Sequence, residues 1–323
     1  MQQNYPVHGV FCAARERIRV SSESRVAVAV ITRRRPDSLA VTLRSLQELQ
    51  VPPSIKVRCI VVDNDAARSA LPVMQNMQQQ TAMALEYAVE ETPGIPHARN
   101  KALELAADED YIAFIDDDDI AEPRWLAALY EAARAYNADV VKGHIVYTFP
   151  AHKEHLAALD IFTDIAVPTG IALDSAWSNN VLFSTKIYNE TGLRFDSSFR
   201  DTGGSDHHFF RRAKQSGAKI IMCREAVVKT SVPVERTTWR WLIRRNMRVG
   251  ATLTISDKKA LGKSAAIRHA WRAALDSFRY ALRLLPGVFS GRNHIVHPSM
   301  AVCFAIGRIA GIFHLSPREY YTR

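Results

Sequence analysis

The 323-residue sequence lacks several features that would place it in a specialised class of protein. Its four cysteines form no Cys-x-x-Cys pair, so neither a disulfide framework nor a zinc knuckle is predicted. It has no run of about 18 uncharged apolar residues, no secretory segment at its start, no internal repeat and no low-complexity tract. We therefore expect a globular protein of a reducing compartment, the cytoplasm, and not an exported, membrane-spanning or solenoid protein.

Acidic residues are scarce in the last quarter of the chain. Residues 236–323 carry 16 Lys and Arg against 3 Asp and Glu, so the net charge of +9 originates there, and residues 1–235 are slightly acidic. A basic block of this kind attracts nucleic acid or an anionic membrane surface, and charge alone does not choose between them.

The first half of the chain alternates short β-branched runs with helical periodicity. The runs predict strands at 25–31, 57–62, 85–90, 111–115 and 140–149. The periodic stretches predict helices at 38–49, 98–107, 125–136 and 207–216. This alternation is typical of an α/β protein with a doubly wound sheet, in which ligands bind beyond the carboxyl ends of the strands.

Polar residues follow three of these strands directly. Thr32 and Arg35 follow the first, Asp63 and Asn64 follow the second, and four consecutive aspartates, 116–119, follow the fourth. Like charges packed together are costly unless a cation compensates them, and Mg²⁺ prefers such oxygen ligands. The run therefore predicts a metal site that holds a diphosphate. A solvated acidic loop that caps the next helix is the alternative.

Seven segments in order resemble one known family. They are VAVAVITRRRPDSLAVTLRSL (26–46), IVVDND (60–65), GIPHARNKAL (94–103), FIDDDDIAEPRWL (114–126), NNVLFSTKIY (179–188), GLRFDSSFRDTGGSDHHFFRRAKQSG (192–217) and ERTTWRWLIRRNMRVG (235–250). Across about residues 25–250 the sequence resembles a family 2 glycosyltransferase of the GT-A fold, of the bacterial exopolysaccharide (succinoglycan-biosynthesis) type. The order of seven matches makes the resemblance specific, whereas any one of them alone would be weak.

The resemblance implies a binding site for a nucleotide-sugar donor, most simply a UDP-sugar, with Mg²⁺ or Mn²⁺ as cofactor. The implied donor-binding residues are Thr32, Arg35, Asp63, Asn64, Arg99, Asn100, Asp116 and Asp117. At the metal site, Asp118 is the first candidate for direct ligation, Asp116 is a candidate for contact with the ribose or with metal-bound water, and the roles of Asp117 and Asp119 stay open. Considered without the resemblance, Asp63 is equally a turn or cap residue, and Arg99 and Asn100 are equally polar residues of a helix's first turn.

Asp206 matches the family's catalytic base. An inverting transfer needs one carboxylate to take the proton of the acceptor hydroxyl. Many relatives have Glu directly before this Asp, and here Ser205 stands there, which leaves that residue's role open. Asp206 also suits a helix cap. The adjacent His207 and His208 are not predicted to bind metal, because helical ligand pairs prefer a spacing of four.

Candidate acceptor-binding residues lie in two segments. They are Trp177, Asn179 and Asn180, whose aromatic and amide groups suit sugar rings, and Gly203 and Gly204, which would let the backbone approach a sugar closely. Where some relatives place a late histidine on the metal, this chain has Lys229, so we expect few protein ligands and mostly donor phosphates around the metal. Arg236, Arg244 and Arg245 are either diphosphate contacts or a solvated basic helix face.

We expect three parts in the chain: an N-terminal extension at 1–24, a catalytic domain at 25–250 and a basic amphipathic helical region at 251–323. Within the domain, 25–120 would bind the donor and 121–250 the acceptor. Aromatic and aliphatic residues alternate with arginines over 264–285, and 300–315 is apolar but short for a span. We expect this region to dock on the anionic inner face of the cytoplasmic membrane. A helical hairpin packed on the domain, or a dimer, is the alternative.

The sequence thus predicts a metal-dependent, inverting glycosyltransferase. It would move a sugar, with glucose as one candidate, from a UDP-sugar to a lipid-linked saccharide in surface polysaccharide synthesis. A nucleotidyltransferase is the first alternative, although it would normally carry a glycine-rich loop where this chain has RRRPDS. A nucleic-acid-binding protein, or one that binds donor without transferring it, is the second, and no nucleic acid partner is expected because four aspartates would repel phosphates.

Overall fold

The structure is a computed structural model that describes residues 23–162, 167–288 and 296–317. The strands are β1 (Ser24–Thr32), β2 (Ile55–Asp63), β3 (Ala84–Val89), β4 (Tyr111–Asp116), β5 (Asp119–Ala121), β6 (Val140–Thr148), β7 (Asn180–Ser184) and β8 (Ile220–Ser231). The helices are α1 (Pro36–Gln47), α2 (Leu71–Gln78), α3 (Ile95–Leu105), α4 (Trp125–Ala135), α5 (Lys186–Asn189), α6 (Ser205–Gln215), α7 (Trp239–Leu261), α8 (Lys263–Val288) and α9 (Val296–Ile312). Short 3₁₀ turns are η1 (Glu154–Ala158), η2 (Asp160–Phe162), η3 (Ser197–Phe199) and η4 (Val234–Thr237).

The strands form one eight-stranded sheet in the order β3-β2-β1-β4-β7-β6-β8-β5. The first four are parallel, β7 runs antiparallel to both β4 and β6, β6 and β8 are parallel, and β5 is antiparallel to β8. The predicted doubly wound α/β fold with a mixed sheet is confirmed. β5, β7 and β8 were not predicted, and β8 is the hardest to find because its apolar run is interrupted by Arg224 and Glu225, near the register shift between β6 and β8.

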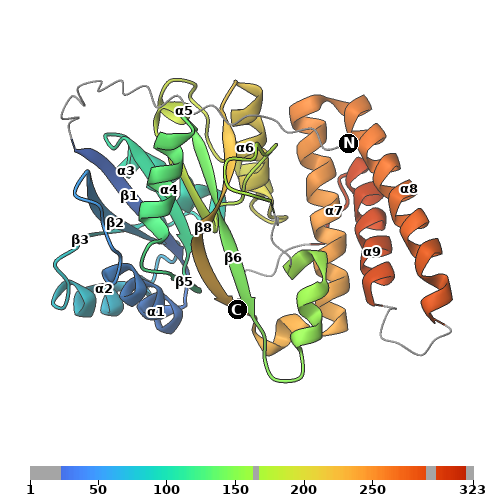
Figure 1. The fold of residues 1–323 in the computed structure, drawn as a ribbon, viewed down its shortest axis with the longest axis horizontal. Coiled ribbons are helices and arrows are strands. Elements are labelled where there is room, and N and C mark those ends of the chain that lie inside the picture. Colours follow the sequence, from blue (N-terminus) through green and yellow to red (C-terminus); the bar gives the residue numbers. More distant parts are fainter. Residues whose placement is uncertain (1–22, 163–166, 289–295, 318–323) are drawn as a thin grey trace, which may run out of the picture.

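Alternate side chains of the buried strands feed two hydrophobic cores, one on each face of the sheet. Val26 and Val28 of β1 pack with α1, α2 and α4, whereas Ala27 and Ala29 pack with α3, α5 and α6. Both faces are therefore covered by helices, as Figure 1 shows.

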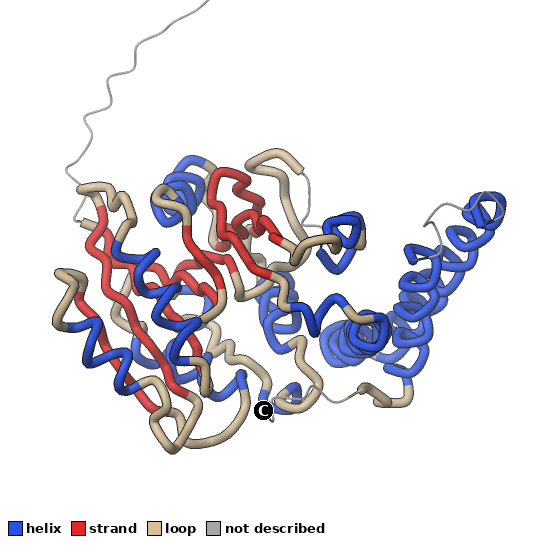
Figure 2. The backbone as a smooth tube through the Cα atoms, turned by 90° about the horizontal axis from the view of Figure 1, so that it is seen from below, coloured by secondary structure: helices blue, strands red, loops and turns tan. Residues whose placement is uncertain are grey.

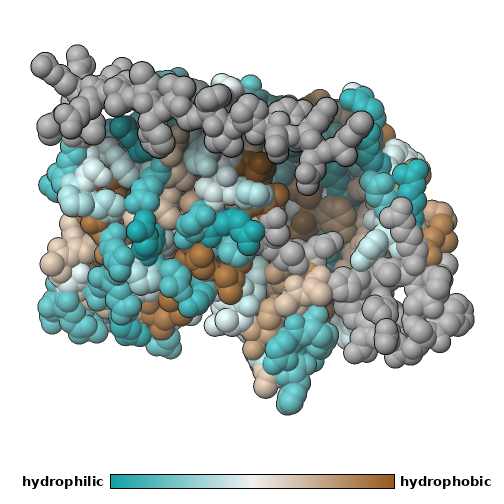
Figure 3. Space-filling view, viewed as in Figure 1, coloured by the Kyte–Doolittle hydropathy of each residue, from teal (hydrophilic) through white to brown (hydrophobic). Residues whose placement is uncertain are grey.

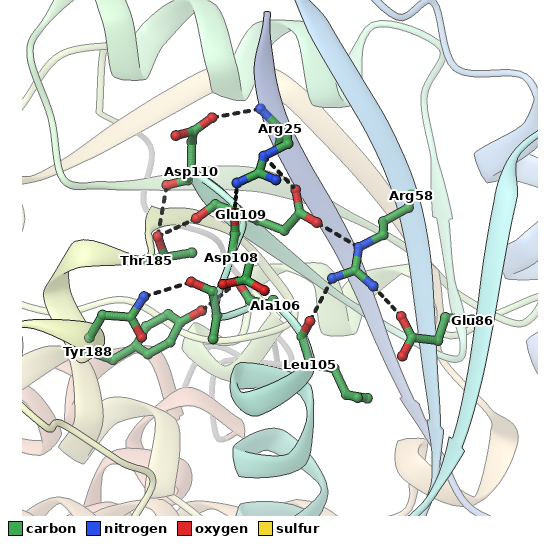
Figure 4. A network of polar contacts seen from close by, with 12 residues as sticks. Arg25, Arg58, Glu86, Leu105, Ala106, Asp108, Glu109, Asp110, Thr185 and Tyr188 are labelled. Carbon is green, nitrogen blue, oxygen red and sulfur yellow. Dashed lines mark hydrogen bonds and ion pairs between the residues drawn. The ribbon is translucent and has the colours of Figure 1, made fainter.

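A polar network closes the amino-terminal edge of the parallel strands, opposite their carboxyl ends (Figure 4). Arg58 of β2 donates from Nε to Glu109 Oε1 at 2.7 Å and from Nη2 to the Leu105 carbonyl at 2.6 Å, and it also pairs with Glu86 of β3. Because these charged groups find their partners within the fold, this edge has a structural role.

The C-terminal helices α7, α8 and α9 pack beside one another at the end of the molecule far from β3, and α7 also contacts α6 (Figure 1). α7 and α9 approach closely because glycines line their contact: a Cβ on Gly307 would lie 2.0 Å from the Met247 carbonyl oxygen, and one on Gly250 would lie 2.2 Å from that of Phe304. The boundary expected at residue 250 thus falls inside α7. In Figure 2 these helices extend away from the sheet.

The predicted helix at 264–285 corresponds to α8, and the apolar stretch at 300–315 corresponds largely to α9. Within the described residues, no helix is long and apolar enough to cross a membrane. The N-terminal extension predicted at 1–24 lies almost entirely outside the described residues.

One buried carboxylate joins all of these helices. Asp257 of α7 accepts a hydrogen bond from Arg308 of α9 at 2.9 Å, lies 2.9 Å from Nδ1 of His269 on α8 and forms an ion pair with Arg211 of α6 at 3.3 Å. Burial alone would raise the pKa of Asp257, but these three partners hold the pKa below its usual value. We call Asp257, Arg211, His269 and Arg308 the Asp257 hub.

Candidate active site

Three strand ends meet at one edge of the sheet, as the sequence predicts. Thr32, the last residue of β1, lies beside Asp63, the last residue of β2, and Ile31 lies beside Asp116, the last residue of β4. The polar residues that follow β1, β2 and β4 therefore come from distant parts of the chain to a single crevice.

Asp117 is the best-fixed member of the run 116–119, which we call the aspartate turn. Thr32 Oγ1 donates to Asp117 Oδ2 at 2.7 Å, and Arg35 Nη1 donates to Asp117 Oδ1 at 3.1 Å. Thr32 and Arg35 are both predicted donor-binding residues, and the structure brings them onto the same carboxylate. Asp117 is thereby oriented by β1 and by the loop that precedes α1.

Asp118 is more open than Asp117, and its ion-pair partners among the described residues are arginines. Its Oδ2 lies 3.3 Å from Arg35 Nη1 and 3.7 Å from Arg236 Nη2, and its side chain is 23% exposed. Arg236 lies in η4, just before α7, so the basic segment after β8 does reach the aspartate turn. Arg244 and Arg245 lie farther along, on α7.

Asp116 carries the clearest electrostatic signal of the turn. Burial and the neighbouring charges of Asp118 and Asp117 raise the pKa of Asp116 to about 7, against the opposing effect of Arg99. The charge of Asp206 raises it further, so Asp206 lies near enough to share the same electrostatic environment. The turn holds more negative charge than its protein partners neutralise.

Asp119 is buried, and β8 and α1 hold it in place. Thr230 of β8 donates to its Oδ1, Thr42 of α1 donates to its backbone carbonyl at 2.8 Å, and its buried Oδ2 has no hydrogen-bond partner. Burial raises the pKa of Asp119 well above its usual value. Asp119 therefore anchors β5 against β8, and the neighbouring Lys229 forms an ion pair with Glu122 instead of reaching the turn.

Asp206 lies in the first turn of α6, which begins one residue earlier at Ser205, so Asp206 is not the helix cap. The backbone N–H of His207 donates to Asp206 Oδ1 at 2.8 Å, and both the N–H and the hydroxyl of Ser178 lie 3.4 Å from Oδ2. Burial pushes the pKa of Asp206 upward, but the Arg99 guanidinium and these N–H groups hold the pKa below its usual value. Asp206 is therefore ionised near neutral pH.

Arg99 of α3 lies near both Asp206 and Asp116, and its charge lowers the pKa of each. Its Nη1 donates to Ser205 Oγ at 3.0 Å, its Nη2 lies 4.0 Å from Asp206 Oδ2, and its guanidinium lies over the Phe195 ring, 5.5 Å from the centroid. Ser205 thus helps to orient Arg99.

The two histidines after Asp206 do not converge on a metal site. His208 is buried with Nδ1 3.2 Å from Ser256 Oγ of α7, and both ring nitrogens of His207 are buried without a hydrogen-bond partner. Burial lowers the pKa of each ring to about 4, so both are neutral at pH 7.

The predicted donor residues Asp63 and Asn64 are engaged inside the protein. Asp63 accepts hydrogen bonds from the Ala70 N–H at 2.8 Å and from the Tyr87 hydroxyl at 3.0 Å. Asn64 accepts from the Gly94 N–H at 2.7 Å and donates to two backbone carbonyls. Both side chains shape the rim of the crevice by holding its loops.

Two side-chain amides that were predicted to bind ligands also hold parts of the backbone in place. Asn100 donates to the Phe195 carbonyl at 2.9 Å and accepts from the Phe195 N–H at 2.8 Å, which fixes the segment before α6. Asn180, a predicted acceptor residue, is fully buried: it accepts from Trp125 Nε1 at 2.8 Å and donates to the His144 carbonyl at 2.9 Å. Asn180 lies in the core and is not presented to a ligand.

The other acceptor candidates lie near Asp206 in the chain or in space. Trp177 is 39% exposed with Lys142 Nζ 5.5 Å from its ring centroid, and Asn179 has a buried Oδ1 without a hydrogen-bond partner. Gly203 and Gly204 have φ values of 74° and 86°, a left-handed conformation that favours glycine.

Ser178 is the contact that sequence reasoning missed. It stands between two candidates, Trp177 and Asn179, but a serine in an irregular segment has no pattern that reveals its partner. Only the fold brings its N–H and hydroxyl to Asp206.

The oxygen-rich turn fits a divalent cation that takes few protein ligands. In the described parts of the chain, no group of three or more His, Cys, Asp or Glu side chains is arranged to hold a metal ion. Asp118 and Asp116 could supply one or two carboxylate ligands, which is the number that Mg²⁺ commonly takes when phosphates complete its coordination.

Comparison with known proteins gives matches to one family. A family model described as glycosyl transferase family 2 matches residues 27–189. The chain is 31% identical over 251 residues to the succinoglycan biosynthesis protein ExoM of Rhizobium meliloti (strain 1021), covering 77% of this chain and 80% of that protein. It is 25% identical over 183 residues to a glucosyl-dolichyl phosphate glucuronosyltransferase of Haloferax volcanii, covering 52% of this chain and 57% of that protein.

Solved structures share the fold. The mannosyltransferase PcManGT from Pyrobaculum calidifontis, in complex with GDP-Man and Mn²⁺, superposes with a TM-score of 0.64 at 18% identity, covering 91% of this chain and 88% of that one. S. aureus TarS 1-349 in complex with UDP-GlcNAc superposes with a TM-score of 0.52 at 15% identity, covering 73% and 67%. At these identities the likeness establishes the GT-A fold.

Proposed function

The chain belongs to glycosyl transferase family 2, and from this premise we propose that it transfers a sugar from a nucleotide sugar to a saccharide acceptor with inversion at the anomeric carbon. Asp206 is the proposed general base, and Asp118 with Asp116 is the proposed metal site.

One observation carries the proposal: the Asp206 carboxylate, held by Arg99 and by two backbone N–H groups, lies near the aspartate turn, in which two arginines pair with two of the four carboxylates. The pKa of Asp206 is held low by Arg99 and by N–H groups, whereas that of Asp116 is raised by burial and by its acidic neighbours. Carboxylates whose environments separate their pKa values commonly divide the roles of a reaction. Asp206 suits proton abstraction, and the turn suits a cation.

In the proposed reaction Asp206 accepts the proton of the acceptor hydroxyl. The acceptor oxygen forms a bond to the anomeric carbon while the bond from that carbon to the diphosphate oxygen breaks, and the nucleoside diphosphate leaves. A single displacement of this kind inverts the configuration. Ser178 and the His207 N–H hold the carboxylate in place.

A bound divalent cation would offset the negative charge that develops on the leaving diphosphate. Asp118 is the best-placed ligand because it is partly exposed and contacts arginines that could turn to phosphate oxygens. Arg35 and Arg236 would then hold the diphosphate. The PcManGT structure contains Mn²⁺, which supports a divalent cation in a protein of this fold.

The donor is proposed to be a UDP-sugar, with glucose as a candidate sugar. TarS is solved with UDP-GlcNAc and PcManGT with GDP-Man, so a nucleoside diphosphate sugar fits this fold. Binding experiments with both kinds of donor decide between uracil and guanine as the nucleobase. Thr32, Arg35, Asp117 and Arg99 are the proposed donor contacts. Asp63, Asn64 and Asn100 would act by shaping the surrounding loops.

The acceptor is proposed to be a lipid-linked saccharide of a surface polysaccharide, made at the inner face of the cytoplasmic membrane. Support comes from the similarity to a succinoglycan biosynthesis protein and from the basic C-terminal region. Trp177, Asn179, Gly203 and Gly204 would line this side of the crevice.

Membership of the family removes the basis for the nucleotidyltransferase alternative.

The test is transfer from a panel of radiolabelled UDP- and GDP-sugars to saccharide-lipid extracts, with Mn²⁺, Mg²⁺ or chelator, followed by NMR of the new linkage. The proposal expects transfer with metal and inverted configuration. Product with retained configuration would contradict the single-displacement role of Asp206.

A further inference from the structure

α8 exposes a continuous apolar stripe. Trp271, Leu275, Phe278 and Leu282 are between 48% and 63% exposed. Their spacing of four, three and four residues places them on one side of a helix. Figure 3 shows hydrophobic side chains at the right-hand edge of the molecule, over α8. We call these four residues the α8 stripe.

The opposite side of α8 is the one that packs. Ala266, Ala270 and Ser277 are buried, and at 3.6 residues per turn they lie about 130°, more than a third of a turn, from the centre of the stripe. The stripe is therefore not a core face that happens to be loosely packed. It points away from the helices that α8 contacts.

Arginines border the stripe on one flank. Arg268, Arg272 and Arg279 flank it along the helix, and the helical repeat puts them within about a quarter turn of the stripe. Arg279 forms an exposed ion pair with Asp276 at 3.5 Å, so the row retains a net positive charge. We call these three residues the arginine row.

α9 repeats the apolar pattern. Val302, Ile306 and Ile309 are exposed at the same helical spacing, whereas Gly307 packs against α7 and Arg308 is buried in the Asp257 hub. Elsewhere, exposed large apolar residues such as Val41 of α1 occur without such a stripe on their helix. Contiguous apolar surface of this kind marks an interaction site.

From these features we propose that the outer face of α8 lies in the surface of an anionic lipid bilayer. The α8 stripe would enter the boundary between headgroups and acyl chains, and the arginine row would contact lipid phosphates, which is the arrangement of an interfacial helix. A row of arginines beside an apolar stripe complements negative headgroups. This inference names the surface behind the membrane location proposed above, and it does not depend on donor, metal or turnover.

The test is flotation of the full chain with vesicles of phosphatidylcholine plus phosphatidylglycerol, and with phosphatidylcholine alone. The native chain should bind the anionic vesicles, less so at high salt. Leu275→Glu combined with Phe278→Glu should lower binding at least about tenfold, because two exposed apolar side chains no longer enter the bilayer. Replacing the arginine row with glutamine should lower binding about fivefold per residue on anionic vesicles only.

Val41→Glu on α1 is the matched control for an exposed apolar residue and should bind like the native chain. Asp206→Asn should also bind like the native chain, which separates this inference from the transferase proposal. Native protein that does not float, or a Leu275→Glu, Phe278→Glu variant that floats equally well, would overturn it. If light scattering instead shows a native dimer that this variant converts to monomer, with no vesicle binding, the stripe joins two copies of the chain and the membrane inference is wrong.

Discussion

The aspartate turn and the Asp257 hub are both sites of buried acidic charge, but they are compensated in opposite ways. In the hub, one carboxylate meets Arg211, His269 and Arg308, and its pKa is lowered. In the turn, Arg35 pairs with Asp117 and Asp118 and Arg236 pairs with Asp118 only, and the pKa of Asp116 is raised to about 7. The neutralised carboxylate of the hub holds helices together. The carboxylates of the turn are only partly neutralised, which favours the binding of a cation.

Asp206 lies between these extremes. Like the Asp257 carboxylate, it is held ionised by an arginine, but its partners leave it 17% exposed and beside the turn. A group that is charged, partly exposed and close to the proposed cation site is suited to chemistry. Substitutions in the aspartate turn, at Asp206 and in the Asp257 hub should therefore distinguish carboxylates that take part in the reaction from carboxylates that only stabilise the fold.

The largest effect is expected from Asp206→Asn. Removing the base should lower turnover by about 10²- to 10⁴-fold, while the melting temperature and donor affinity stay near native values because the amide fills the same space. Asp201→Asn, an exposed neighbour that pairs with Arg200, is the control and should retain activity. Native turnover in the Asp206 variant would remove that residue from the mechanism.

Asp118→Ala should abolish the metal-stimulated part of donor binding while leaving the fold intact. The loss follows because the partly exposed Asp118 is the proposed direct ligand. Calorimetry with Mn²⁺ and a nucleotide sugar measures it. Asp119→Asn is the informative companion, since Asp119 faces β8 and should leave metal affinity close to native; the reverse result would place the metal elsewhere in the turn.

Asp257→Asn should lower the free energy of unfolding and leave turnover unchanged. Breaking a buried ion pair leaves Arg308 uncompensated and typically costs about 3–5 kcal/mol. Denaturant unfolding should show this loss, while turnover of the still-folded protein stays near native. A variant that is as stable as native but inactive would mean that the hub belongs to the catalytic machinery.

Acid should destabilise the seam between α6 and α7. Burial lowers the pKa of His207 and His208 from near 6.5 to about 4, so the unfolded chain binds more protons between these values. The free energy of unfolding should therefore fall as pH drops from about 6.5 towards 4, by up to about 3 kcal/mol per histidine. His208→Gln should flatten this slope; an unchanged slope would mean that His208 does not titrate there.

The smallest effect is expected from Ser178→Ala. It removes one hydroxyl at 3.4 Å from Asp206 but keeps the backbone N–H contact. Turnover should fall only a few-fold, and the acid limb of its pH profile should move slightly upward because the carboxylate loses a donor. A loss as large as that of Asp206→Asn would make Ser178 part of the reacting group.

The sequence predicts the parts of this site that depend on strand order. Thr32, Asp63 and Asp116 end neighbouring strands, so the periodic apolar runs were sufficient to bring them together. β5 was not predicted because three residues are too few to show a strand pattern. β8 was not predicted because charged residues interrupt its apolar run. The strands that form the crevice, and hence its location, follow from local patterns.

The roles of individual polar side chains were less predictable. Asp63, Asn64, Asn100 and Asn180 match positions expected to bind ligands, and in the structure they form hydrogen bonds with backbone groups and with the side chains of Ser69, Tyr87 and Trp125. Those partners come from distant segments, and no spacing in the sequence reveals which way an amide points. Tertiary contacts decide whether such a residue binds a ligand or holds a backbone segment in place.

The most direct test of the central claim is calorimetric titration of UDP- and GDP-sugars into the purified chain with Mn²⁺, and again with chelator. If the aspartate turn is an under-compensated cation site, at least one nucleotide sugar should bind tightly with metal, at least about tenfold more weakly without it, and not respond to metal in the Asp118→Ala variant. Binding that is equally tight with and without metal, in both proteins, would contradict the claim and leave the turn a structural acidic loop.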